Sequence, residues 1–276
     1  MHVITLGTGS PLPDANRAGP ATLVRAGGAE LLFDCGRGVV MRLAGARTGP
    51  ALISAVLLTH LHSDHVSDLN DVLTTRWAMS PVESPLRIFG PVGTGRHVAR
   101  MLEMMGDDVG YRRTHHADLN WDPAVEVTEV DAGPLEIDGV SLCVAPTDHS
   151  PVRPTVGYRV EEGAASVVIG GDSVPCRGLD LLCAGADAYV QTVVRPSLVE
   201  QVPSSRFQDV LDYHSSIADA AATAARGGVG TLVLTHLVPA PWPGTEGEWA
   251  EEARAHFGGE VVVAHDLLEL EVAPRT

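Results

Sequence analysis

Short apolar runs that end in Gly, Pro, Asp or His follow one another along the whole chain, and this pattern predicts many strands with helices between them. Alternating or continuous apolar segments predict strands at 2–6, 21–25, 30–33, 51–58, 86–89, 125–130, 135–137, 140–145, 155–161, 166–169, 188–194, 231–234, 261–264 and 267–272. Helical spacing predicts helices at 39–46, 66–79, 94–105, 179–184, 217–226 and 246–257. The segments 106–123 and 195–213 lack a clear period, so they are predicted to be loops, the second with a helical piece.

The order of these elements is two successive halves, each made of strands followed by helix, with polar residues gathered at strand ends. This order favours a protein of the α/β (α+β) class, folded as a four-layer αββα sandwich with its functional site along one edge between two sheets. No linker-like or low-complexity segment divides the chain, so we expect a single domain over residues 1–276.

The composition is that of a globular protein, with 45% hydrophobic and 20% charged residues among 276. The net charge is −16, and all 19 basic residues are arginine. Because an acidic surface repels polyanions, the charge counts against nucleic acid as the main ligand, although a local arginine patch could override it. The N-terminus lacks a signal peptide, no apolar run could span a membrane, and the four cysteines form no paired motif. These features predict a cytoplasmic protein without membrane association.

The candidate chemistry centres on residues 57–65, where His60, His62, Asp64 and His65 directly follow an apolar run. Imidazole nitrogen and carboxylate oxygen are the ligands that zinc and similar borderline metals take. A polar surface turn would be the ordinary alternative, but it would not need such crowding. The spacing therefore predicts a metal site at the end of a buried strand.

Further candidate residues stand at the ends of other predicted strands. His149 follows the strand 140–145, Asp172 follows two glycines after 166–169, and His236 follows 231–234. His214 opens a predicted helix, and Asp34 ends the strand 30–33. In layered α/β folds the loops at the carboxyl ends of strands converge on one crevice, so these side chains are expected to meet there.

The motif H-x-H-x-D-H at 60–65 resembles the signature of the metallo-β-lactamase fold superfamily, and the resemblance covers essentially the whole chain. Within the superfamily, the chain is similar to the branch of ribonuclease Z and related phosphodiesterases and arylsulfatases. This similarity rests on Gly-Thr-Gly-Ser-Pro at 7–11, Gly-Asp-Ser-Val-Pro at 171–175 and His-Ser-Ser at 214–216.

The resemblance implies a centre with two metal ions, zinc in the first instance and manganese or iron as alternatives. It assigns His60, His62 and His149 to one ion, Asp64, His65 and His236 to the other, and Asp172 to both. Asp64 would also accept a proton from the attacking water, and His214 would donate a proton or hydrogen bond without binding metal. Asp34 would orient a ligand imidazole. The implied activity is hydrolysis by a hydroxide bound to the dinuclear metal centre.

The substrate is predicted less directly. Bacterial ribonuclease Z carries a protruding tRNA-binding arm between the third-motif His and the Gly-Asp strand, and here 150–171 holds only strand, turn and strand. With the acidic surface, this favours a phosphodiester, sulfate ester or related small-molecule ester over nucleic acid.

Several alternatives stay open: a ribonuclease Z-type tRNA 3′ endonuclease, a lactonase or β-lactamase-type acyl hydrolase, a two-iron oxidoreductase and a metal-stabilised binding module without catalysis. Dimers are common among the proteins it resembles, so a homodimer is also left open.

Overall fold

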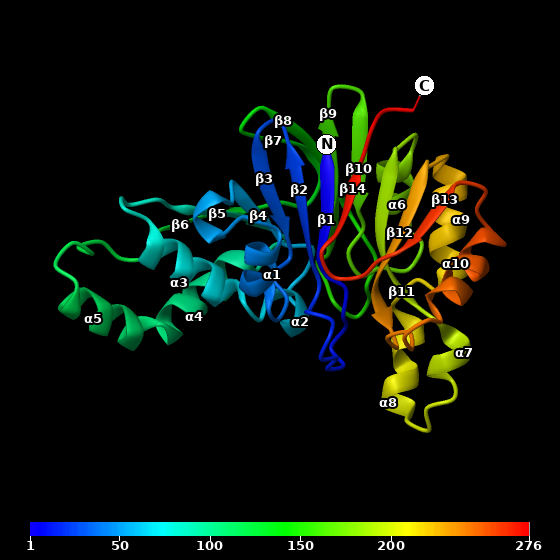
Figure 1. Cartoon of the computed structure of the whole chain (residues 1–276), viewed down its shortest axis with the longest axis horizontal. Helices are drawn as coiled ribbons and strands as arrows, with labels where there is room; N and C mark the ends of the chain where they lie inside the picture. Colours follow the sequence, from blue (N-terminus) through cyan, green and yellow to red (C-terminus); the bar gives the residue numbers. More distant parts are fainter. Residues whose placement is uncertain (276) are drawn as a thin grey trace.

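The computed structural model describes residues 1–275, and it contains two seven-stranded sheets packed face to face with helices on their outer faces (Figure 1). In spatial order the first sheet consists of β14 (Leu268–Glu271), β1 (His2–Gly7), β2 (Ala21–Ala26), β3 (Ala29–Phe33), β4 (Ala55–Leu57), β5 (Leu86–Gly90) and β6 (Val125–Glu129). The second consists of β13 (Glu260–Val263), β12 (Thr231–Val238), β11 (Ala188–Val194), β10 (Ala165–Ile169), β9 (Val156–Glu162), β8 (Val140–Pro146) and β7 (Gly133–Ile137).

The helices divide between the two sheets in the order of the sequence. Those of the first half are α1 (Val39–Gly45), the 3-10 helix η1 (Pro50–Leu52), α2 (Ser63–Val66), α3 (Leu69–Met79), α4 (Thr94–Met104) and α5 (Gly106–His115). Those of the second half are α6 (Arg177–Cys183), α7 (Pro196–Val199), α8 (Ser205–Gln208), the 3-10 helix η2 (Asp209–Asp212), α9 (Ile217–Gly227) and α10 (Glu246–Arg254). Among the described residues, no helix is long and apolar enough to cross a membrane.

The central layer of the core lies between the two sheets. Phe33 of the first sheet meets Tyr158 of the second edge to face, with ring centroids 5.5 Å apart, and Val190 and Val233 belong to the same buried cluster. Two further clusters lie between each sheet and its own helices. The predicted αββα sandwich is therefore confirmed, and the hydrophobic effect acts on both faces of each sheet.

The strand predicted at 51–58 is wrong at its beginning. The strand β4 covers only Ala55–Leu57, and the residues before it form the 3-10 helix η1. Pro50 occupies the first turn of η1, where its missing N–H costs nothing. The guanidinium of Arg76 then donates hydrogen bonds to the carbonyls of Pro50 and Ile53, both at 2.9 Å, which holds this turn against α3.

The single helix predicted at 66–79 is two helices, because tertiary hydrogen bonds interrupt it at Asp68. The Asp68 carboxylate accepts the backbone N–H of Gly38 at 2.5 Å, and the Asp68 N–H donates to the carbonyl of Cys35 at 3.0 Å. The helix α3 then begins at Leu69, and its predicted inward stripe through Trp77 is buried, as expected.

The loop predicted at 106–123 is wrong in its first part, which is the helix α5. No residue of α5 is buried, so the sequence carries no apolar stripe that could reveal the helix. Asp107 and Asp108 in its first turn and the ion pair between Asp108 and Arg112, at 2.8 Å, stabilise it locally.

Candidate metal centre

The candidate side chains come together at the ends of parallel strands in both sheets. In the first sheet β3 and β4 are parallel neighbours, and Asp34 and His60 follow them. In the second sheet β10, β11 and β12 are parallel, with Asp172 after β10 and His236 within β12. Gly171, with φ of +65°, lets this strand end approach the first sheet closely, since a Cβ there would lie 2.8 Å from Cβ of Thr59.

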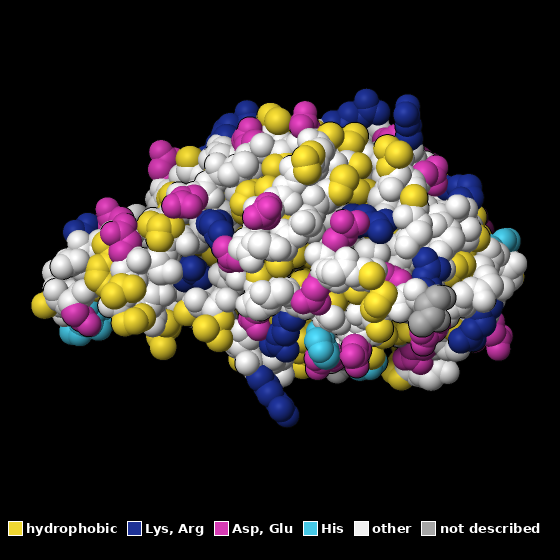
Figure 2. Space-filling model, turned by 90° about the horizontal axis from the view of Figure 1, so that it is seen from above, with side chains coloured by type: hydrophobic (Ala, Val, Ile, Leu, Met, Phe, Trp, Pro, Cys, Tyr) yellow, Lys and Arg dark blue, Asp and Glu magenta, His cyan; other side chains and the backbone are white. Residues whose placement is uncertain are grey.

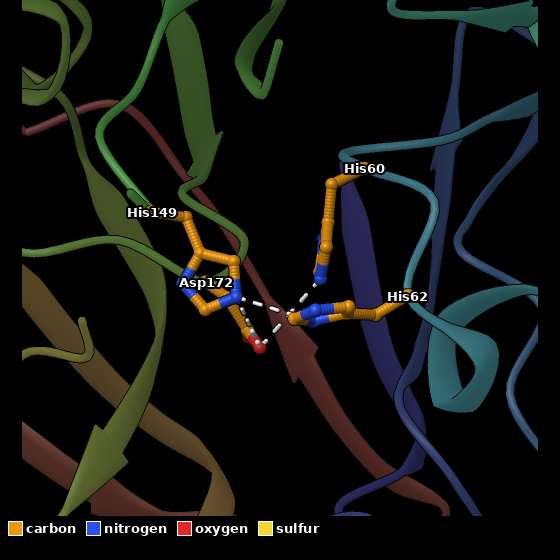
Figure 3. A group of neighbouring side chains, drawn as sticks. All are labelled: His60, His62, His149 and Asp172. Carbon is orange, nitrogen blue, oxygen red and sulfur yellow. Dashed lines mark hydrogen bonds and ion pairs between the residues drawn. The ribbon is translucent and has the colours of Figure 1, made fainter. Parts of the chain in front are cut away.

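Four of these side chains form one group that could hold a metal ion: His60, His62, His149 and Asp172. Figure 3 shows that His60 and His62 approach from one side and His149 and Asp172 from the other, with their polar ends directed at a common point. A second group lies beside it and contains Asp64, His65 and His236.

The Asp172 carboxylate lies at the centre of both groups. Its Oδ2 is 3.3 Å from Nε2 of His65 and 3.6 Å from Nε2 of His236, and it is 3.8 Å from Nε2 of both His60 and His149. One carboxylate oxygen therefore faces imidazoles of both groups, as a ligand shared by two cations requires.

Asp34 fixes the orientation of the histidine loop. Its carboxylate accepts hydrogen bonds from the N–H and the hydroxyl of Thr59, both at 2.8 Å, and from Nδ1 of His65 at 2.8 Å. Because the Thr59 hydroxyl donates to Asp34, it accepts from Nδ1 of His60, at 3.0 Å. These bonds place the protons of both rings on Nδ1 and leave the Nε2 lone pairs facing the site.

The residues fit a bound cation, because several buried polar atoms of the site have no hydrogen-bond partner within residues 1–275. These atoms are Nε2 of His60, Nε2 of His65 and Oδ1 of Asp172. Leaving a buried polar atom unsatisfied costs on the order of 1–3 kcal/mol. A cation bound at the groups would supply partners for lone pairs that the protein itself does not satisfy.

The protonation states also suit cation binding. Burial lowers the pKa of His60 and His62, and it lowers that of His149 to about 4, so these rings are neutral at pH 7. Charge interactions with the neighbouring rings of His236 and His65 outweigh burial and hold the pKa of the Asp172 carboxyl well below its ordinary value. The Asp172 and Asp34 carboxylates in turn outweigh burial and raise the pKa of His65, so a bound cation would take the place of the proton on Nε2 of this ring. Neutral imidazoles and an ionised carboxylate are the forms that bind metals.

His214 lies beside the two groups but belongs to neither. Its Nδ1 donates to the carbonyl of Val210 at 2.9 Å, and its Nε2 donates to Oδ2 of Asp172 at 3.1 Å. Burial opposes the charged form, but the hydrogen bond to Asp172 outweighs it and raises the pKa of His214. Both ring nitrogens thus face acceptor oxygens, and the ring is set to carry a proton.

The structure thus brings all the predicted site residues together, in the grouping that the resemblance implied. The sequence reasoning missed Thr59 and Tyr213. Thr59 links Asp34 to His60, and the carbonyl of Tyr213 accepts from Nδ1 of His149 at 2.8 Å. The only signal for Tyr213 in the sequence was its place directly before His214.

Comparison with known proteins identifies the family. The model described as "Beta-lactamase superfamily domain" matches residues 30–237. A protein named ribonuclease Z from Mycolicibacterium paratuberculosis is 57% identical over 275 residues, which cover 99% of this chain and 98% of the relative. The ribonuclease Z of Mycobacterium tuberculosis H37Rv is 53% identical over 278 residues, with 100% and 99% of the two chains covered.

Solved structures agree on the fold. The human short-form tRNase Z superposes with a TM-score of 0.74 at 24% identity, covering 99% of this chain and all of the other. The metallo-β-lactamase fold protein YhfI from Bacillus subtilis gives 0.75 at 22% identity, with 98% of each chain covered.

These relatives correct the prediction of a small-molecule substrate with nucleic acid disfavoured, which is wrong. Proteins named ribonuclease Z match nearly end to end, so they too have no room for a long additional arm at 150–171. The net charge of −16 was a poor basis for disfavouring nucleic acid, because it sums charges over the whole surface. At physiological salt, charges more than about 8 Å from a bound ligand are largely screened.

The matching domain model covers most of the chain, and the curated relatives align over nearly all of it. The two His/Asp groups are those expected of a dinuclear site in this fold. The chain therefore belongs to the β-lactamase superfamily and, within it, to the ribonuclease Z family of metal-dependent hydrolases.

Proposed function

We propose that the protein is an endonuclease that cleaves a phosphodiester bond at the 3′ end of precursor tRNA. The supporting observation is its identity of more than half, over its full length, to proteins named ribonuclease Z, together with a complete set of candidate ligands. This was the alternative from the sequence, and the comparisons favour it over sulfate-ester or acyl-ester hydrolysis.

In this proposal, two divalent cations, zinc by the nature of the imidazole and carboxylate donors, bind the two groups. His60, His62 and His149 would hold one, Asp64, His65 and His236 would hold the other, and Asp172 would contribute to both. When bound, they supply the Lewis acidity that activates a water and stabilises charge on the phosphodiester.

The protein's own groups move the protons. Asp64 is ionised, because its hydrogen bond to His236 outweighs burial and lowers the pKa of the carboxyl, and it accepts a proton from the attacking water. His214 carries a proton on the nitrogen that faces Asp172 and donates it to the leaving oxygen. Asp34 and the carbonyl of Tyr213 keep the rings of His65 and His149 in position.

The test is cleavage of a precursor tRNA transcript with a 3′ trailer by the purified, zinc-loaded protein. One discrete cut at the 3′ end is expected, with loss of cleavage after chelation, recovery with added zinc, and about two metal ions per chain. The Asp64→Asn variant should be folded but inactive. A zinc-loaded protein that hydrolyses bis(4-nitrophenyl) phosphate and leaves the transcript intact would contradict the proposed substrate while retaining the chemistry.

A further inference from the structure

A pocket of about 450 Å³ opens on the outer side of the histidine loop, between α2, α3 and α4. Leu61 and Ser63 line it, and in the sequence they alternate with His60, His62 and Asp64 of the metal centre. The pocket is thus separated from the candidate metal ligands only by the thickness of one chain segment. Its volume is in the range of small-ligand sites.

The far wall of the pocket is one face of α4. His97, Arg100 and Met104 line it at helical spacing, and the near wall contributes Ser67 and Asn70. Met104 is 69% exposed, although it is a large apolar side chain. The pocket therefore combines an apolar surface with a cation and several hydrogen-bonding groups.

The charge of this wall has no partner within the protein. More than half of the 19 arginines form ion pairs with carboxylates, but within residues 1–275 neither Arg96 nor Arg100 has a carboxylate oxygen within 4.0 Å. The carboxylate of Glu129, the last residue of β6, lies beside the start of α4 and accepts hydrogen bonds from the backbone N–H groups of Gly93 and Gly95. Arg96 does not line the pocket but lies near Leu61, which does: a Cβ built on Gly93 would lie 3.9 Å from Nη2 of Arg96 and 3.4 Å from Cδ1 of Leu61.

Helix stability does not explain these arginines. Arg96 stands in the first turn of α4, where the helix dipole disfavours a cation, and Arg100 follows at i+4, where like charges repel. Burial and the guanidinium of Arg100 lower the pKa of His97, so this ring is neutral at pH 7 and free to hydrogen-bond. Figure 2, which views the molecule from above Figure 1, shows basic and acidic side chains interleaved on that face.

We propose that this pocket binds the RNA strand next to the cleaved bond, with the guanidinium of Arg100 on a backbone phosphate and a base against Leu61 and Met104. The occupant is an RNA segment because the pocket joins unpaired cations to an apolar surface and is continuous with the catalytic loop. The inference rests on the proposed function and specifies where its substrate would be held.

The decisive variant is Arg100→Gln, since Arg100 is exposed and its replacement should not disturb folding. KM for precursor tRNA should rise about tenfold with little change in kcat, and the slope of log KM against log salt should fall by about one. Hydrolysis of bis(4-nitrophenyl) phosphate, which has no flanking nucleotide, should be unchanged. Met104→Glu should weaken RNA binding similarly, because it places a negative charge at the apolar wall.

The matched control is Arg254→Gln, an exposed helical arginine on α10 that also lacks a carboxylate partner within the described residues. A KM and salt slope for Arg100→Gln equal to those of this control would overturn the inference, as would an equal loss on both substrates.

Affinity for a labelled single-stranded oligoribonucleotide, measured by fluorescence anisotropy on the zinc-loaded protein, separates the inference from the proposed function. Weaker binding by Arg100→Gln, with normal binding by Arg254→Gln, would support the pocket even if the wild type failed to cleave precursor tRNA. Equal binding by both variants would overturn the pocket even if cleavage succeeded.

Discussion

Asp34 combines burial, a positive φ of 59° and three accepted hydrogen bonds in one residue. Asparagine tolerates the same backbone conformation, so Asp34→Asn tests the charge and the hydrogen bonding alone. The amide N–H₂ of Asn would donate to Nδ1 of His65 and move the ring proton to Nε2, which faces the metal centre. Metal affinity should fall about 10- to 100-fold. Titration with chelators of graded affinity measures it, and wild-type metal retention in the variant would contradict the orienting role.

His214 separates catalysis from metal binding, because it contacts Asp172 but lies outside both groups. His214→Gln should lower kcat by about 10²- to 10⁴-fold, as expected for loss of a general acid, with metal content unchanged. Metal analysis alongside single-turnover kinetics checks both. A variant that loses one metal ion per chain would make His214 a ligand instead.

At the residue scale, the sequence predicts the candidate metal ligands better than it predicts the groups that orient them. His60, His62, Asp64 and His65 could be predicted because they crowd into six positions after a buried strand. The carbonyl of Tyr213 could not, since a backbone acceptor has no residue-type signature. The position of the Asp172 carboxylate among five imidazoles could not be predicted either. It depends on how the two sheets pack against each other, and the spacing of residues along the sequence does not reveal this packing.

Among the elements, α9 connects stability to the site, because its N-cap Ser216 lies two residues after His214. Ser216 caps it with a reciprocal box, in which its hydroxyl accepts the N–H of Asp219 and the Asp219 carboxylate accepts the N–H of Ser216. Ser216→Ala should lower the free energy of unfolding by about 1 kcal/mol. Urea unfolding measures this, with Ser197→Ala, an exposed serine, as the control expected to change little. Equal stabilities would show that the cap contributes nothing.

The elements that the sequence predicted well are those with a buried face. Every strand of the two sheets was predicted to within a few residues except at the start of β4 and the end of β12. Before β4, Pro50 and the carbonyl contacts of Arg76 replace the first predicted strand residues by a 3-10 helix. The strand β12 continues to Val238, so His236 lies within it rather than after it. The helix α5 was missed because it buries no residue and is stabilised by exposed ion pairs. Tertiary hydrogen bonds of Asp68 separate α2 from α3, and the hydrophobic periodicity of the sequence does not predict such bonds.

At the scale of the whole molecule, net charge proved a poor guide to the ligand. The ion pairs distribute most arginines among acidic partners, so the sum of −16 conceals where unpaired cations remain. Two of these stand on α4 beside the histidine loop. The electrostatic field that acts on a bound polyanion comes mainly from the charges near its binding site. The local distribution of charge therefore matters more for binding than the net charge of the protein.

The C-terminal tail is tied to the second sheet by Asp187, which gives the fold a pH dependence of known sign. The Asp187 carboxylate accepts the N–H of Arg275 at 3.0 Å and the N–H of Ser166 at 2.8 Å, and these bonds outweigh burial and lower the pKa of the carboxyl. In the unfolded chain this carboxyl has an ordinary pKa of about 3.9, so it is protonated at a higher pH than in the folded protein. The stabilisation is therefore complete above about pH 5 and is lost as the pH falls through the folded-state pKa.

Asp187→Asn should be less stable than wild type at pH 7, and urea unfolding should show the difference shrinking below pH 4. Both proteins keep the same metal ligands, so protonation of the site cancels in the comparison, and Asp122→Asn, in an exposed ion pair, should show no such convergence. Curves for Asp187→Asn and wild type that stay parallel down to pH 3 would show that the carboxylate charge does not hold the tail.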